Sequence, residues 1–487
     1  MKSPFPGALI SITIGVSVIV GLWLGVASTI GTAAALPVLM LSAVALAWLL
    51  ARPAQPLAVF LFAWAPSLFL LKDVTVTSLS DQPLNLSRAL GALLFAGLLG
   101  RVTLIAFSRD RSIRIGPAIL PLFVFGFYLI VSFIRSPDPA AAGAELLRYW
   151  TGILFLLVLR DETKSLSDLS RYAGIATAGI TIAAIITLVA RVIPGAEDLG
   201  LIEVTAGVDR AAGTMGAAGA TAALLFAGIP MLLAPPSNAL HGFFLKLRTT
   251  SLILIVAALV ATLTRGILIC LPPYFLCWLY LSRDRQRRTI WKPRIVVIAL
   301  LSLGLLLGVF QSTAVSERLQ DIPFIGTTLT DPAAGTGRLF LWTSSIQGWL
   351  HAPLLSKILG LGLHSSPTLI WAGLDTDLGT GPHNTYLWLL VETGIIGVLL
   401  YFWFVIAMTS HLLRRARGSG ASGSTPILQS FFASAVSFFI AYHLLEEMFM
   451  SQVVSFGGHA YMLALLALAT AELWPAEAPG ATLDSRG

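Results

Sequence analysis

Residues 382–397 read Pro-His-Asn-Thr-Tyr-Leu-Trp-Leu-Leu-Val-Glu-Thr-Gly-Ile-Ile-Gly, and they open a long apolar run. The polar pair His383-Asn384 stands where the run begins, and Glu392 follows about two and a half helical turns later. Charged and titratable side chains are costly inside a bilayer, so a membrane helix that carries them is a candidate functional site. The stretch therefore predicts a membrane helix whose first turn contains functional side chains.

The composition of the whole chain is that of a membrane protein. Of its 487 residues, 56% are hydrophobic and 11% are charged, and the mean hydropathy is +0.85, which excludes an ordinary soluble domain. Apolar runs that are long enough, or nearly so, to cross ~30 Å of hydrocarbon recur along the chain. The runs lack the alternation of a β-barrel, and backbone groups in lipid must be satisfied internally. The fold class we predict is an all-α polytopic membrane protein.

We predict about 12–14 transmembrane helices, the lower number applying if short runs are re-entrant or merged. The runs lie near 8–30, 33–51, 56–71, 88–107, 117–134, 146–160, 172–193, 214–235, 249–264, 267–282, 295–312, 384–409, 427–447 and 453–473. We expect the first run to be a retained helix, since it is too long for a signal peptide. The predicted organisation is a transmembrane bundle over 1–312, an outward loop with amphipathic helices over 313–383, C-terminal transmembrane helices over 384–474 and a cytoplasmic tail over 475–487.

The distribution of Lys and Arg predicts the orientation. Most of the 31 basic residues fall in one set of alternate loops, which includes both ends of the chain. The positive-inside rule then places both termini in the cytoplasm. It follows that the 194–213 loop, the Thr264-Arg265-Gly266 turn and the 313–383 loop face outward. These basic loops account for the pI of 9.6 without a nucleic acid partner.

The outward loop over 313–383 is too long to be a simple connection, and loops of this length tend to be functional. From Arg338 to Trp349 its apolar residues recur at helical spacing, which predicts an amphipathic helix at the membrane surface. Glycine-containing turns at 335–337 and 360–362 bound the element. Trp342, Trp349, Trp371 and Trp388 are most simply an interfacial aromatic belt.

These motifs together resemble a known family. They are Gly337-Arg338 with Trp342, Gly360-Leu361-Gly362, and His383-Asn384 followed by Leu387, Glu392, Gly394 and Gly397. The pattern resembles the Wzy_C family of bacterial O-antigen ligases and O-antigen polymerases. Arg210-Ala-Ala-Gly213 and Leu263-Thr264-Arg265-Gly266 fit as well, so the resemblance covers about residues 205–400. Thr264 stands where the family more often has Ser, and 216–219 lacks the Pro-Asn that often follows the first arginine element.

The resemblance implies a membrane glycosyltransferase, with a fold like that of the GT-C class, in the bacterial inner membrane. Its active site would lie on the periplasmic side, with no cofactor and no metal. The implied glycan donor is an O-antigen on undecaprenyl pyrophosphate, and the implied acceptor is a hydroxyl of lipid A–core oligosaccharide for a ligase or a second lipid-linked repeat for a polymerase. We favour the ligase because the outward loop is moderate in size and because the apolar surfaces must receive two lipid substrates alongside membrane lipids.

Specific residues suit this chemistry. His383 is the candidate catalytic base, because the partial positive charge of a helix N-terminus favours its neutral ring. Arg210, Arg265 and Arg338 lie at outward helix ends or in the outward loop, where guanidinium groups can bind phosphate oxygens in two-point fashion. They would replace a metal ion, and a single displacement would invert the anomeric centre.

Helix geometry assigns a supporting role to Glu392. On one straight helix, residues 383, 387, 390, 394 and 397 share a stripe, and the glycines among them would allow close contact with a neighbouring helix. Glu392 would project from roughly the opposite face, about 13 Å deeper than His383. We therefore expect Glu392 to support the structure through a hydrogen bond or an ion pair, with Asn384 supporting His383.

Plainer interpretations remain open for each residue. His383 could be a polar boundary residue, Arg210 and Arg265 could be membrane anchors, and Arg338 could be an ordinary loop charge. For Arg88, Arg135, Arg148 and Arg191 the anchor interpretation is preferred, and for His351, His364, Asp375 and Asp377 a solvated loop is preferred over a metal site. A proton-coupled transporter is the rival class, because His443, Glu446 and Glu447 have relay-like spacing. No inverted repeat supports it.

Overall fold

The computed structural model describes residues 57–58, 60–62, 75–79, 82–107, 115–197, 199, 201–205, 208–215, 217–234, 241–282, 338–367, 382–418, 426–445 and 459–473. Of the predicted spans, those near 8–30, 33–51 and 295–312 lie outside these residues, as does most of 56–71. Every other predicted span contains a helix in the structure.

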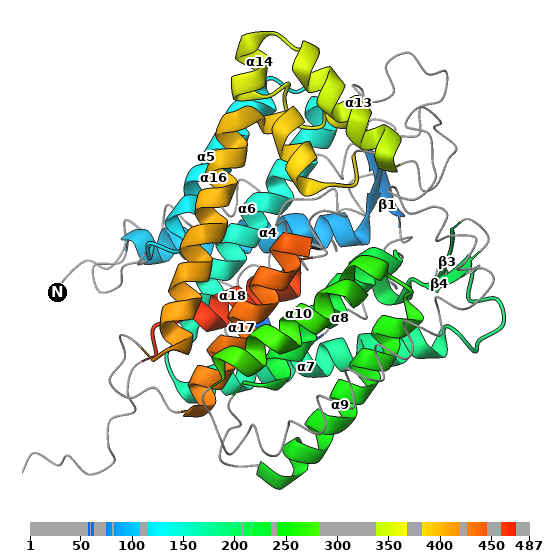
Figure 1. Ribbon diagram of the computed structural model, residues 1–487, viewed down its shortest axis with the longest axis vertical. Helices are drawn as coiled ribbons and strands as arrows, with labels where there is room; N and C mark the ends of the chain where they lie inside the picture. Colours follow the sequence, from blue (N-terminus) through cyan, green and yellow to red (C-terminus); the bar gives the residue numbers. More distant parts are fainter. Residues whose placement is uncertain are drawn as a thin grey trace, which may run out of the picture.

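The described part of the chain is helical apart from two short hairpins (Figure 1). In order, the elements are β1 Thr75–Leu79, β2 Gln82–Asn85, α4 Leu86–Phe107, α5 Leu120–Ile134, α6 Pro139–Glu162, α7 Leu166–Val189, β3 Ile202–Thr205, β4 Val208–Ala211, the 3₁₀ turn η1 Gly213–Met215, α8 Ala218–Leu232, α9 His241–Ala261, α10 Arg265–Leu281, α13 Arg338–His351, α14 Leu354–Leu359, α16 Thr385–Ala416, α17 Pro426–Leu445 and α18 Ala460–Thr470. Each hairpin is antiparallel. The two hairpins were not predicted from the sequence.

The helices form two groups joined by a central pair. Helices α4, α5 and α6 pack together with α16, whereas α7, α8 and α9 pack against one another. Helix α17 packs on both α16 and α10, and α18 packs on both α6 and α8. The short helices α13 and α14 cover one end of the bundle, at the top of Figure 1.

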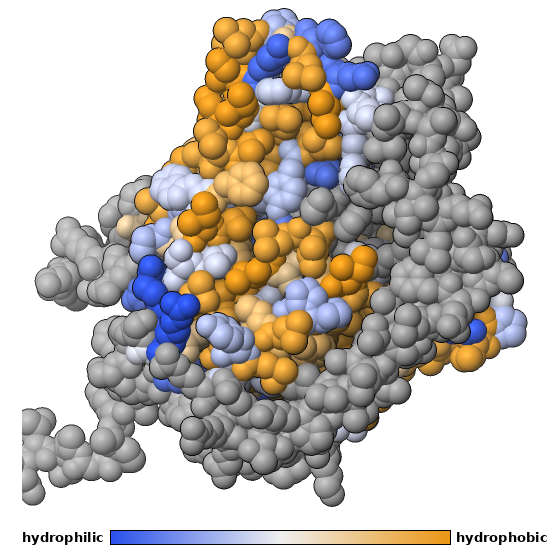
Figure 2. Space-filling model, viewed as in Figure 1, coloured by the Kyte–Doolittle hydropathy of each residue, from blue (hydrophilic) through white to orange (hydrophobic). Residues whose placement is uncertain are grey.

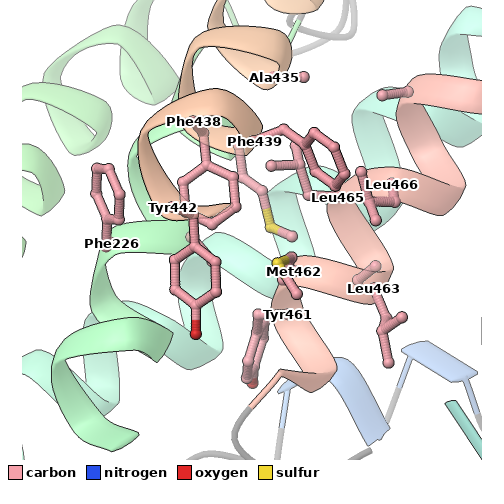
Figure 3. Close-up of a cluster of buried hydrophobic side chains, with 14 of the residues drawn as sticks. Phe226, Ala435, Phe438, Phe439, Tyr442, Tyr461, Met462, Leu463, Leu465 and Leu466 are labelled. Atoms are coloured by element: carbon pink, nitrogen blue, oxygen red, sulfur yellow. The ribbon is translucent and has the colours of Figure 1, made fainter. Parts of the chain in front are cut away.

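The centre of the bundle is apolar and tightly filled. Every residue of α18 is buried, and the aromatic face of α17 lies against it. Phe438 of α17 packs on Phe226 of α8 with ring centroids 4.8 Å apart, next to Tyr442 and Met462 (Figure 3). A helix that is apolar on all sides must lie inside a protein or a membrane, and α18 lies inside the protein.

The outer surface of the bundle is also apolar. Phe127, Ile134, Leu276 and Ile406 are each more than half exposed. On the face shown in Figure 2, apolar side chains cover the middle, while hydrophilic side chains gather at the top and lower left. Exposed apolar surface of this extent is typical of a protein that sits in a membrane.

Within the described residues, four helices are long and apolar enough to span a membrane by length and composition. They are Pro139–Glu162, Leu166–Val189, Thr385–Ala416 and Leu428–Leu445, and six shorter apolar helices accompany them. The helical membrane class predicted from the sequence is therefore confirmed.

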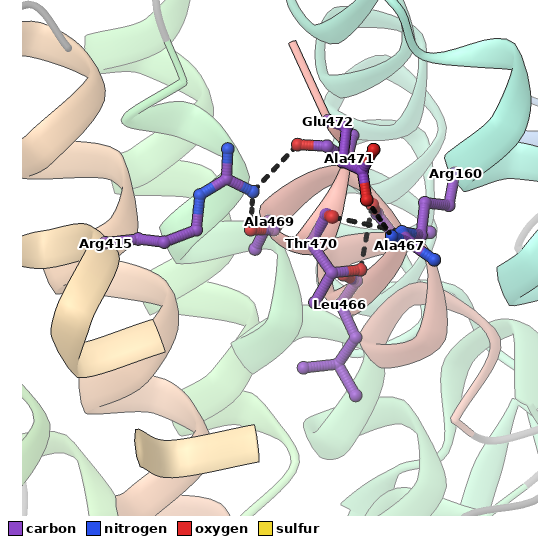
Figure 4. A network of polar contacts seen from close by, with 8 residues as sticks. All are labelled: Arg160, Arg415, Leu466, Ala467, Ala469, Thr470, Ala471 and Glu472. Atoms are coloured by element: carbon purple, nitrogen blue, oxygen red, sulfur yellow. Dashed lines mark hydrogen bonds and ion pairs between the residues drawn. The ribbon is translucent and has the colours of Figure 1, made fainter. Parts of the chain in front are cut away.

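Two arginines converge on the carboxyl end of α18. Arg415 of α16 donates hydrogen bonds of 2.8 Å to the carbonyls of Ala469 and Ala471, and Arg160 of α6 donates one of 3.1 Å to that of Thr470 (Figure 4). The last carbonyls of a helix lack partners within it and carry partial negative charge. The guanidinium groups supply those partners, and they fix the ends of α6, α16 and α18 at one end of the bundle.

Helix α16 is broken, contrary to the prediction of one straight helix. Gly394 has φ 66° and ψ −169°, which divides a first segment, 385–393, from the long remainder. A side chain on Gly394 would lie 2.4 Å from the Ile358 carbonyl oxygen and from the Gly360 nitrogen. The predicted close approach at Gly394 is therefore correct, but its partner is the end of α14. Residue 397 instead meets the side chain of Thr393 on its own helix.

Candidate functional site

The start of α16 fixes the backbone beside His383. Asn384 is the N-cap of α16, and its side-chain oxygen accepts hydrogen bonds from the backbone N–H groups of Tyr386 and Leu387 at 3.0 and 3.1 Å. Such a cap holds the chain at a defined angle as it enters the helix. His383 is half-buried and adopts φ 47°, a left-handed conformation that is uncommon outside glycine. The Asn384 cap therefore adjoins a histidine in a constrained conformation.

Helix α13 is joined to this turn. Trp342 Nε1 donates a 3.0 Å hydrogen bond to the carbonyl of Pro382, the residue before His383. Arg338 is the first residue of α13 and lies one turn before Trp342. The helix predicted over Arg338–Trp349 is confirmed, and its first turn lies beside the His383 turn.

Arg210 lies on β4 and is held at the α9–α10 turn. Its Nη2 donates to Thr264 Oγ1 at 3.1 Å and its Nε donates to the Thr262 carbonyl at 3.3 Å. Thr264 in turn donates from Oγ1 to the Ala218 carbonyl at 3.2 Å. The side chain of Arg210 thus connects the β3–β4 hairpin to the turn that carries Arg265.

Arg265 is the first residue of α10, directly after this turn. Leu263, two residues before Arg265, has φ 49°, so a second non-glycine residue with left-handed backbone lies close in sequence to a predicted site residue. Residues in such conformations persist only where their surroundings hold them, and they are concentrated at functional sites.

The predicted site residues therefore form two groups. Arg210 is joined to the turn before Arg265, and the helix that begins at Arg338 is joined to the turn of His383. In Figure 1 the β3–β4 hairpin, the first turn of α10 and the first turn of α13 all lie toward the right-hand side of the bundle.

Glu392 is hydrogen-bonded to the loop that follows α14. Its carboxylate accepts hydrogen bonds from the backbone N–H groups of His364 at 2.7 Å and Ser366 at 3.2 Å, and its side chain is fully buried. Its carbonyl accepts from Ser132 Oγ of α5 at 2.7 Å and from Gly362 N at 3.1 Å. Glu392 therefore lies against the loop that follows α14, contrary to its predicted place deeper along a straight helix.

Several residues weighed from the sequence have other surroundings in the structure. Trp388 is buried in the core, so its assignment to an aromatic belt is wrong. Arg135 donates to Ser356 Oγ at 3.1 Å and so joins α5 to α14. His443 is fully buried, and its ring centroid lies 4.0 Å from that of Phe439. Trp371, Asp375, Asp377, Glu446 and Glu447 lie outside the described residues.

The sequence reasoning missed two residues at the Arg210 group. Glu203 on β3 pairs with Arg210 across the hairpin. Thr264 accepts a hydrogen bond from Arg210. The signal in the sequence that could have identified Glu203 is its charge, which is opposite to that of Arg210. The two residues flank a short connection that suits a two-residue hairpin turn. From the sequence, Thr264 is apparent only as a departure from the more frequent serine.

A comparison with protein families gives one result for this chain. Residues 250–402 match the family model Wzy_C, described as O-Antigen ligase. The matched segment contains Arg265, Arg338, His383, Asn384 and Glu392, whereas Arg210 precedes it. A search of the curated proteins finds none that matches. The chain therefore carries a Wzy_C region over residues 250–402.

Proposed function

We propose that the protein is a lipopolysaccharide O-antigen ligase of the bacterial inner membrane. It transfers a glycan from undecaprenyl pyrophosphate to a hydroxyl of lipid A–core oligosaccharide, with both termini in the cytoplasm and the site on the periplasmic side. The observation that carries this proposal is the capped His383-Asn384 turn, which lies inside the Wzy_C segment and beside the start of α13.

The reaction is a single displacement at the anomeric carbon. His383 takes the proton of the acceptor hydroxyl, whose oxygen forms the new bond to that carbon while the bond to the pyrophosphate oxygen breaks. The electron pair of the broken bond leaves with undecaprenyl pyrophosphate, and the anomeric configuration is inverted. A ring held at a helix N-terminus suits the base role, because the helix dipole favours neutral imidazole.

Charge on the departing pyrophosphate is stabilised by arginines. The Arg210 guanidinium is already oriented by Thr264 and Thr262, and Arg265 begins the adjacent helix. Preorganised cations of this kind stabilise charge that develops in the transition state, and Arg remains charged at any accessible pH. Arg338 joins them from the first turn of α13 in this proposal.

Reconstitution tests the proposal directly. The purified full-length protein in liposomes, supplied with undecaprenyl pyrophosphate-linked glycan and lipid A–core, should form glycan-bearing lipid A–core without any other protein. Activity should survive EDTA, and loss that Mg²⁺ restores would overturn metal-independent transfer. Absence of transfer, together with dissipation of a solute gradient by the same liposomes, would identify a transporter.

A gene deletion separates the ligase from the polymerase of the same family. Deletion of a ligase should leave bare lipid A–core on a lipopolysaccharide gel, with full-length polymer retained on undecaprenyl pyrophosphate. Lipid A–core that carries one repeat would instead identify a polymerase.

A further inference from the structure

Glu203 faces Arg210 directly across the β3–β4 hairpin. The register pairs the two residues, and Glu203 Oε1 lies 3.4 Å from Arg210 Nη1. The other carboxylate oxygen, Oε2, accepts a 2.7 Å hydrogen bond from Ala218 N at the start of α8. The α8 N-cap is Ala217, which has no side-chain oxygen to cap the helix, so Glu203 supplies that cap from the hairpin.

The two contacts of the carboxylate differ in strength. A separation of 2.7 Å is that of a good charge-assisted hydrogen bond, whereas 3.4 Å lies beyond the usual range for one. The side chains of Arg210 and Glu203 also keep 19% and 32% of their surface exposed, so an incoming anion can reach the pair. Of these two contacts of Glu203, the shorter one is with α8 and the longer one is with the guanidinium.

Arg210 keeps its orientation without Glu203. Its Nη2 and Nε contacts to Thr264 and Thr262 come from the α9–α10 turn and do not involve the carboxylate. An anion that replaces Oε1 at Nη1 would therefore meet a guanidinium that is already positioned.

We infer that Glu203 is a positioning residue that competes with the pyrophosphate group of the lipid-linked glycan for Arg210. This inference rests on the proposed function. A phosphate oxygen replaces Oε1 at the Arg210 guanidinium when the substrate binds, while Oε2 stays on Ala218. Glu203 re-pairs with Arg210 after transfer, and its negative charge favours the release of undecaprenyl pyrophosphate.

Glu203→Gln tests the inference, because glutamine keeps an oxygen for Ala218 N and loses the charge beside Arg210. The control is Glu197→Gln, which removes one exposed charge from the loop before the same hairpin. Binding of inorganic pyrophosphate to the full-length protein is measured by calorimetry in nanodiscs of phosphatidylcholine, which exclude anionic lipid headgroups. Arg210→Ala shows whether the binding depends on Arg210.

Pyrophosphate should bind Glu203→Gln roughly five-fold more tightly than wild type, which is the effect of one partly screened charge. The KM for the lipid-linked glycan should fall similarly with no rise in kcat, whereas Glu197→Gln should match wild type in both. Unchanged or weaker pyrophosphate binding in folded Glu203→Gln, an equal gain in Glu197→Gln, or binding that survives Arg210→Ala would each overturn the inference.

The two readouts separate this inference from the proposed function. If wild type transfers glycan but Glu203→Gln binds pyrophosphate as wild type does, only the inference fails. If neither wild type nor any variant transfers glycan, but Glu203→Gln binds pyrophosphate more tightly than wild type, the proposed function fails. The inferred competition between Glu203 and pyrophosphate for Arg210 is then still supported.

Discussion

His383 combines a titratable ring with a backbone conformation that few residues adopt. Its φ of 47° is left-handed, and the Asn384 cap and the Trp342–Pro382 hydrogen bond hold the chain on either side of it. Asparagine adopts this conformation more readily than most residues, whereas alanine does not. A substitution that probes the ring must therefore respect the backbone.

His383→Asn should abolish transfer and leave the protein folded. The asparagine side-chain amide cannot take the proton of the acceptor hydroxyl at neutral pH. The loss of a general base costs about 10²–10⁴-fold in rate. The measurement is transfer in liposomes, with thermal unfolding in detergent as the check on folding. Transfer within about ten-fold of wild type in folded protein would remove His383 from the base role.

The arginines show what the sequence could predict at the scale of single residues. The charge rule predicts outward positions for these arginines, where positive charge is unusual, and those positions stay a prediction. The partner of Arg210 could not be predicted from the sequence, since its pairing with Glu203 depends on the register of a hairpin whose strands have four residues each. Such short strands carry little periodic signal.

Hydropathy located the helices but not where they begin. The run near 146–160 belongs to α6, which begins at Pro139 because Asp138 caps it at Ala140 N and Ala141 N. Similarly, α7 begins at Leu166 after a capping box formed by Ser165 and Asp168. Polar capping residues extend both helices beyond their apolar runs, and a hydropathy scan excludes those residues.

The break in α16 was hidden from the sequence for a related reason. Gly394 stands in a continuous apolar run, where glycine is as readily a packing residue as a break. What decides between them is the tertiary contact with Ile358 and Gly360, residues more than thirty positions earlier in the chain. Glu392 lies two residues before the break, and its carboxylate accepts hydrogen bonds from the loop after α14.

Gly394→Ala should destabilise the protein by about 2–3 kcal/mol or more, because φ 66° with ψ −169° is a region that only glycine occupies readily. The new Cβ would also meet backbone atoms at 2.4 Å. Thermal unfolding in detergent should show a lower midpoint, and transfer should fall because the segment before the break begins directly after the His383-Asn384 turn. The control is Gly174→Ala in α7, where the added Cβ meets nothing within 4 Å. Equal midpoints for the two variants would show that the break is not required.

At the scale of the whole molecule, the contacts define two ends. Arg160, Arg415 and Glu472 meet at the carboxyl end of α18, and residues near Arg160 and Arg415 belong to the loops that the charge rule places in the cytoplasm. The β3–β4 hairpin, α13 and the His383 turn belong to the segments that it places outside. The orientation is a prediction of this rule.

Cysteine labelling tests the orientation with two exposed positions. In a Cys277→Ser background, where the remaining Cys270 is buried, Glu197→Cys should react with an impermeant maleimide in cells with a permeabilised outer membrane. Lys164→Cys, between α6 and α7, should react only after the inner membrane is disrupted. The reverse pattern would place Arg210 and His383 in the cytoplasm, where nucleotide sugars are available and a lipid pyrophosphate donor is not required. The ligase proposal would then lose its physical basis, because periplasmic transfer is what demands a donor already activated on a lipid.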